Sequence, residues 1–123
     1  MVKPAGRRIL VVEDEMMIAL MMEDILAALG FQFAGRAHTV ATALAIIETD
    51  AQGIDAVTLD LNLGGERSDA VADALEAHGI PFIVMTGYAE SDTSARFDGR
   101  PVVRKPFLRG QVEEALLSLE LSR

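Results

Sequence analysis

Short apolar runs alternate with longer stretches of helical periodicity along the chain. The run 9–12 is fully apolar and rich in β-branched residues, which is typical of a central parallel strand covered on both faces. Runs and amphipathic stretches of this kind predict strands at 9–12, 31–37, 56–63, 80–85 and 101–104, and helices at 16–29, 39–48, 68–77 and 108–121. This alternation predicts an α/β fold with a doubly wound, five-stranded parallel sheet and helices on both faces.

Single residues mark several helix ends. Gly30 stands where a C-terminal cap is expected, and Thr39 and Ser68 offer side-chain oxygens as N-caps. The polar segment 87–99 carries only a weak helical pattern, so a fourth helix there should be short or disordered. The first helix contains several methionines, which we expect in the core and at its margin, although exposed methionines would suit an adaptable docking face: Met16, Met17, Met21 and Met22.

Composition narrows the class of protein. A chain of 123 residues predicts a single domain over 1–123, with residues 1–6 flexible and no output domain. The absence of cysteine excludes disulfides, thiolate metal sites and thiol catalysis. There is no apolar stretch long enough for a membrane span and no export signal, so a cytoplasmic protein is expected. A formal net charge of −8 argues against nucleic acid as a partner.

Polar side chains follow four of the predicted strands. Glu13 and Asp14 end the first, Asp60 lies in the third, Thr86 ends the fourth and Lys105 ends the fifth. In open α/β sheets the functional site lies beyond the carboxyl ends of the strands. We therefore expect three carboxylates, a hydroxyl and an ammonium to share one crevice.

These residue types indicate phosphoryl chemistry. Crowded carboxylates repel one another unless a hard divalent cation such as Mg²⁺ lies among them. Lys105 would add a second positive charge, and two unit charges about 4 Å apart interact with about 4 kcal/mol at an effective dielectric constant of 20. A site with this balance can receive a phosphoryl dianion, with Asp60 as the nucleophile.

The ordered set of motifs resembles the response-regulator receiver domain of two-component signalling, which has a flavodoxin-like fold. The resemblance covers nearly the whole chain. Residues 82–88 also resemble a stand-alone subgroup whose fourth strand ends in a Phe-Ala-Thr-Gly-like sequence. The anchors of the resemblance are Val11-Val12-Glu13-Asp14-Glu15, Asp60, Thr86-Gly87 and Lys105-Pro106-Phe107.

The resemblance implies a role for each residue of the crevice. Asp60 would be the phosphoacceptor, and Asp14, Asp60 and the backbone carbonyl of Asn62 would bind Mg²⁺. Glu13 would assist through water. Thr86 and Lys105 would hold phosphoryl oxygens.

The same resemblance implies how such a protein works. A histidine kinase or a histidine phosphotransferase would phosphorylate the domain, which would act through protein contacts as a monomer or weak dimer. It would not be an enzyme apart from catalysing its own phosphorylation and dephosphorylation. The family commonly has a cis peptide bond before the proline equivalent to Pro106.

Two departures from the family pattern change the expected behaviour. Gly64 and Gly65 replace the methionine-proline turn of many receivers, so this loop should be more flexible. Val102 stands where many receivers carry a switching aromatic residue. We therefore expect Tyr88 to act as the switch, with the polar segment from Tyr88 to Gly99 becoming ordered on phosphorylation. The alternative is that Tyr88 only shields the site from water and sets the rate of dephosphorylation.

Two alternatives remain from the sequence. The chain could be a degenerate receiver that acts only as a binding module, which the presence of Asp14, Asp60, Thr86 and Lys105 disfavours. It could instead be an aspartate-nucleophile phosphatase of the haloacid dehalogenase type. That family carries Asp-x-Asp on its first strand, whereas here Asp60 is on the third predicted strand and is followed two positions later by Asn62.

Overall fold

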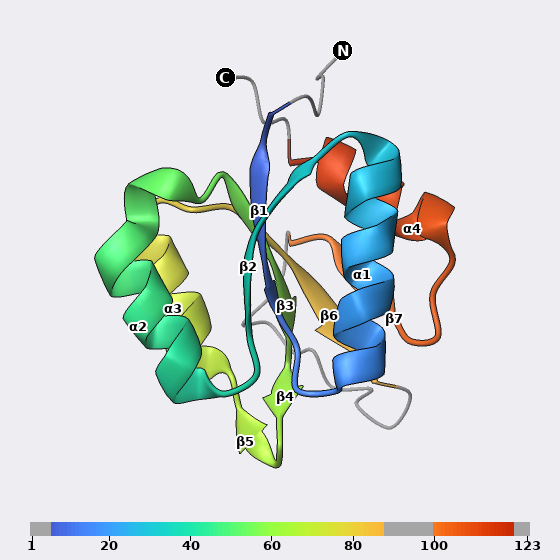
Figure 1. The fold of residues 1–123 in the computed structure, drawn as a ribbon. Helices are drawn as coiled ribbons and strands as arrows, with labels where there is room; N and C mark the ends of the chain where they lie inside the picture. The colour runs from blue at the N-terminus through green and yellow to red at the C-terminus, as the bar shows by residue number, and fades with distance from the viewer. Residues whose placement is uncertain (1–5, 88–99, 120–123) are drawn as a thin grey trace.

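A five-stranded parallel sheet forms the centre of the molecule in the computed structural model, which describes residues 6–87 and 100–119 (Figure 1). The strand order is β2-β1-β3-β6-β7. The predicted fold class is confirmed. The strands are β1 (Arg8–Val12), β2 (Gln32–Ala37), β3 (Ala56–Asp60), β6 (Phe82–Thr86) and β7 (Val102–Arg104).

Helices cover both faces of the sheet. Figure 1 shows α1 (Met16–Leu29) and α4 (Arg109–Leu117) on one face, with α2 (Val40–Asp50) and α3 (Asp69–Ala77) on the other. A 3₁₀ turn, Ala51–Gly53, follows α2. Alternate residues of β1 enter two separate cores, because successive side chains of a strand point to opposite faces: Ile9 and Val11 pack with α1 and α4, and Leu10 and Val12 with α2 and α3.

The helix ends agree with the predicted caps at two positions. Gly30 has φ 94°, and its N–H bonds to carbonyls of the last turn of α1. The Thr39 hydroxyl accepts the N–H of Thr42 at the start of α2. Ser68 occupies the N-cap position of α3 but makes no side-chain cap bond. Its hydroxyl donates instead to the backbone carbonyl of Asp60, at 2.6 Å.

The predicted strand 56–63 is wrong at its end. The strand β3 stops at Asp60, and the chain then forms an antiparallel hairpin of β4 (Asn62–Leu63) and β5 (Glu66–Arg67). Gly64 and Gly65 have φ values of 62° and 89°, the left-handed conformations that a two-residue type I′ turn requires. The stretch expected to be a flexible loop is therefore regularly hydrogen-bonded.

Several predictions concern residues outside those described. They include the flexible start of the chain, the switch at Tyr88, the fourth helix within 88–99 and the continuation of the last helix to 121. Within 6–87 and 100–119, no helix is long and apolar enough to cross a membrane.

The topology places a crevice at one edge of the sheet. Strand β1 pairs with β2 on one side and with β3 on the other, so the connections leaving β1 and β2 run in opposite directions across the sheet. This is a topological switch point, and ligands bind beyond the carboxyl ends of the strands that flank it. Glu13 follows β1 directly, as the sequence predicts, and Asp60 is the last residue of β3 rather than lying within the strand.

Candidate functional site

Three carboxylates meet at this edge of the sheet. One oxygen from each of Glu13, Asp14 and Asp60 lies within 4.8 Å of the others. Glu13 and Asp60 are each only 3% exposed, whereas Asp14 is the most accessible of the three. Buried carboxylates at this separation repel one another, so the cluster needs positive charge.

Lys105 supplies one such charge. Its Nζ lies 2.7 Å from Asp60 Oδ2 and 2.8 Å from Glu13 Oε1. Its backbone N–H donates to the Thr86 carbonyl, which extends the β6–β7 pairing by one residue and aims the side chain at the cluster. The peptide bond from Lys105 to Pro106 is cis, as the resemblance implied.

Titration of the cluster reflects the balance between burial and charge. Burial raises the pKa of Glu13 from 4.5 to about 7; the hydrogen bond from Lys105 opposes this shift and the charge of Asp60 adds to it. Burial alone would lower the pKa of Lys105, but hydrogen bonds to Asp60 and Glu13 outweigh burial and raise it. Near neutral pH, Glu13 is therefore partly protonated.

Backbone N–H groups of the β4–β5 hairpin also orient the carboxylates. Asn62 N–H donates to Asp60 Oδ1 at 3.1 Å, and Gly64 N–H donates to Asp14 Oδ2 at 2.9 Å. The Asn62 side chain accepts the N–H of Gly65, which braces the turn. Gly64 and Ser68 support the site without having been predicted to do so, although a Gly-Gly pair that follows an apolar strand is itself a hairpin signal.

Two further predicted residues lie at the same edge. Thr86 is fully buried at the end of β6, one residue beyond Met85, which pairs with Asp60. Its hydroxyl lies 3.3 Å from the Gly87 carbonyl, as donor. Asn62 contacts Asp60 through its N–H, which places its backbone beside the phosphoacceptor candidate. Tyr88 lies outside the described residues.

The donor set suits a hard divalent cation. Three carboxylates and one ammonium leave an excess of negative charge, and the candidate ligand atoms are all oxygen, which Mg²⁺ prefers. Asp14 Oδ2 and Asp60 Oδ1 each accept one backbone N–H, so each carboxylate is held in one orientation while retaining lone pairs for a metal. The residues present fit a small metal site.

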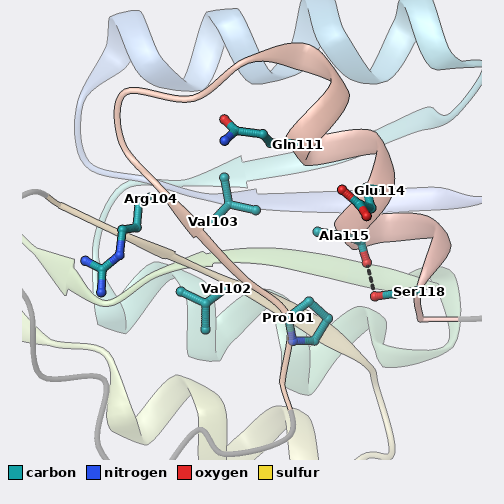
Figure 2. Close-up of a pocket in the computed structure, with 8 residues that line it drawn as sticks. All are labelled: Pro101, Val102, Val103, Arg104, Gln111, Glu114, Ala115 and Ser118. Atoms are coloured by element: carbon teal, nitrogen blue, oxygen red, sulfur yellow. Dashed lines mark hydrogen bonds between the residues drawn. The ribbon is translucent and has the colours of Figure 1, made fainter.

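A separate groove of about 600 Å³ lies between β7 and α4. Figure 2 shows that strand and helix side chains line it and that none of the predicted site residues is among them. The groove is therefore distinct from the acidic cluster. Its lining residues are Pro101, Val102, Val103, Arg104, Gln111, Glu114, Ala115 and Ser118.

Known proteins resemble this chain over most of its length. A family model described as "Response regulator receiver domain" matches residues 9–117. The phyllosphere-induced regulator PhyR of Methylorubrum extorquens is 32% identical over 110 residues, covering 88% of this chain but only 41% of PhyR. The solution structure of SdrG from Sphingomonas melonis Fr1 is 48% identical, covers 93% of this chain and 96% of SdrG, and has a TM-score of 0.83. The BeF3-activated conformation of SdrG from Pseudomonas melonis Fr1, also 48% identical, covers 94% and 97% with a TM-score of 0.79.

Proposed function

This chain belongs to the response regulator receiver domain family, and from that premise we propose that it is a phosphoacceptor in a two-component phosphorelay. Receiver domains are signalling domains rather than enzymes in the ordinary sense. The observation that carries the proposal is the position of Lys105 between Asp60 and Glu13, at the ends of the strands that flank the topological switch point. Membership of this family also sets aside the dehalogenase alternative.

Asp60 is the proposed nucleophile. An Asp60 oxygen attacks the phosphorus of a phosphohistidine, the P–N bond breaks, and the released imidazole takes up a proton. The product is an acyl phosphate on Asp60. Lys105 then holds a phosphoryl oxygen, and Thr86 would donate its hydroxyl to another. These residues act by positioning and charge neutralisation, which are the main requirements of phosphoryl transfer.

The acidic cluster is the proposed Mg²⁺ site. Asp14, Asp60 and the carbonyl of Asn62 would bind the ion directly, and Glu13 would contact it through water. Bound Mg²⁺ supplies additional neutralisation of phosphoryl charge. The described separation of the three carboxylates supports this assignment. The BeF3-activated conformation of SdrG supports the phosphoacceptor role, because beryllofluoride replaces a phosphoryl group.

The test of this function is direct phosphorylation by a small phosphodonor. With Mg²⁺ present, we expect the intact mass to increase by one phosphoryl group; with the metal chelated, or in Asp14→Ala, we expect almost no increase, because only one direct carboxylate then remains. Mg²⁺ without phosphodonor should leave the mass unchanged. A chain that binds a partner protein but never gains mass would instead be a binding module.

An exposed apolar patch on α1 is the proposed docking surface for the phosphodonor. Of the four methionines expected in the core and at its margin, Met22 is in the core, at 2% exposed, whereas the other three are exposed, as an adaptable docking face would require. Met17 is 75% exposed, and the patch begins directly after the acidic residues that end β1. A histidine kinase or phosphotransferase that docks there would bring its phosphohistidine to Asp60 in the cytoplasm. The patch comprises Met16, Met17, Leu20 and Met21.

A Met17→Lys variant should accept phosphate more slowly than the wild type from a protein donor, but at the wild-type rate from a small phosphodonor. Truncating or charging an interface anchor typically costs about 1.4 kcal/mol or more, which is about tenfold in rate or affinity. The measurement is phosphotransfer from a phosphorylated histidine kinase that modifies the wild-type chain, compared with transfer from a small phosphodonor. Gln52→Lys makes the same charge change on an exposed residue before β3, at the opposite edge of the sheet, and should behave as wild type. Equal slowing with both donors would rule out a docking role.

A further inference from the structure

Residues at the end of β2 bind both the N–H and the carbonyl of Glu13. Regular pairing of β1 with β2 ends at Val12 and Ala37. The Glu13 N–H still donates to the Ala37 carbonyl at 2.9 Å. The carbonyl of Glu13 is met by a side chain instead, because His38 Nδ1 lies 2.9 Å from it. The last residue of β2 and the residue that follows it therefore engage both backbone polar groups of Glu13.

The identity of the partner determines the protonation of the imidazole. A backbone carbonyl can only accept a hydrogen bond, so Nδ1 of His38 must carry the proton. The neutral ring is then the Nδ1–H tautomer. His38 is half-buried.

The backbone on either side of His38 is restrained. Ala37, on one side, is fully buried at the end of β2. Thr39, on the other side, caps α2 through the N–H of Thr42. Because both neighbours are fixed, the imidazole is presented to Glu13 with little further loss of conformational freedom.

The Glu13 carbonyl and the Asp14 N–H belong to one planar peptide group. A hydrogen bond that fixes this carbonyl therefore also fixes the direction of the bond from the Asp14 nitrogen to its Cα, the atom that carries the side chain. The Asp14 carboxylate is in turn reached by Gly64 N–H, 50 residues away in the sequence. His38 and Gly64 thus restrain Asp14 from its backbone and from its carboxylate.

We propose that His38 is a positioning residue that orients the Glu13–Asp14 peptide so that Asp14 faces the metal site. This inference rests on the proposed function, since it concerns the Mg²⁺ that the cluster would bind. His38 touches neither the metal nor the phosphoryl group. Partners that orient metal ligands typically contribute about 10- to 100-fold to metal affinity.

The experiment is a Mg²⁺ titration of the full chain, followed through amide chemical shifts. We expect His38→Ala to bind Mg²⁺ about tenfold more weakly or worse. In His38→Asn, the amide nitrogen can donate to the same carbonyl, and affinity should recover to within about threefold. His78→Ala is the matched control, because it removes the other histidine of the chain, at the C-cap of α3 near Glu48, without touching Glu13 or His38; its Mg²⁺ affinity should stay at the wild-type value.

A second measurement is independent of any metal. Nitrogen-15 spectra of the wild-type protein at about pH 8, where an ordinary imidazole is neutral, should show His38 protonated at Nδ1. Protonation at Nε2 alone would overturn the inference, and so would wild-type Mg²⁺ affinity in His38→Ala, with the proposed function left standing. A wild-type protein that binds no Mg²⁺ would overturn both, and the wild-type titration by itself identifies that case.

Discussion

An Asp60→Asn variant should fold and take up no phosphoryl group from any donor. The amide keeps the shape of the side chain but lacks the nucleophilic oxygen anion. The amide oxygen can still accept from Lys105 or from the N–H of Asn62, and Lys105 keeps Glu13 as a counter-ion, so the free energy of unfolding should change by only about 1 kcal/mol. Intact mass after incubation with phosphodonor and Mg²⁺ is the measurement.

The matched control is Asp24→Asn, which makes the same change on the exposed surface of α1. This variant should gain mass as the wild type does. Phosphorylation of Asp60→Asn at the wild-type level would show that another residue accepts phosphate. In that case Asp60 would serve only as part of the metal site.

Replacing Lys105 by methionine should cost several kcal/mol of stability above neutral pH. The side chain of Lys105 is 15% exposed and those of its two carboxylate partners 4%, so its removal leaves buried negative charges without their cation. Breaking a buried ion pair from one side typically costs about 3–5 kcal/mol. Denaturant unfolding with the metal chelated, at about pH 8, measures the loss.

The loss should shrink at acidic pH. The folded-state pKa of Glu13, about 7, is above the unfolded value of 4.5, so its contribution to stability is full below pH 4.5 and is lost as pH rises towards 7. Lys105 lowers the pKa of Glu13, so this pKa is higher in the variant. The variant therefore loses the most stability at the high pH values at which Glu13 must give up its proton. At about pH 5, Glu13 is neutral in both proteins, and only the pair with Asp60 is lost.

Lys105→Arg is the control for charge. Arginine keeps a cation in the cluster, so this variant should retain most of the stability that methionine loses, while its different geometry should impair phosphorylation. Equal stability of Lys105→Met and wild type at about pH 8 would show that Lys105 does not hold the cluster together.

Much of the site could be predicted from strand ends alone. Glu13, Asp60 and Lys105 each follow or end a short apolar run, and parallel strands bring their carboxyl ends to one edge of the sheet. The meeting of these three side chains depends only on the order of the strands. This explains why the sequence was enough to predict that Lys105 lies beside two carboxylates that precede it by 45 residues or more.

The supports of the site could not be predicted in the same way. The bond from Gly64 to Asp14 joins residues 50 positions apart and depends on the turn between β4 and β5. Ser68 has the sequence signature of a helix cap, yet its hydroxyl satisfies the Asp60 carbonyl, which is buried at a strand end. The exposure of Met17 likewise depends on which side of α1 faces the sheet, and a helix rich in apolar residues on every side leaves this open.

At the turn formed by Gly64 and Gly65, the backbone conformation and the N–H of Gly64 are required, whereas the identity of the side chain is not. A Cβ added to either glycine would meet nothing within 4 Å, so the only penalty of a side chain is its left-handed backbone, which asparagine and aspartate tolerate best. Every residue except proline retains the N–H that Gly64 gives to Asp14. The tip is therefore a position where descendants of this sequence could vary the chemistry at the rim of the site, and with it their choice of partner, while the buried scaffold stays unchanged.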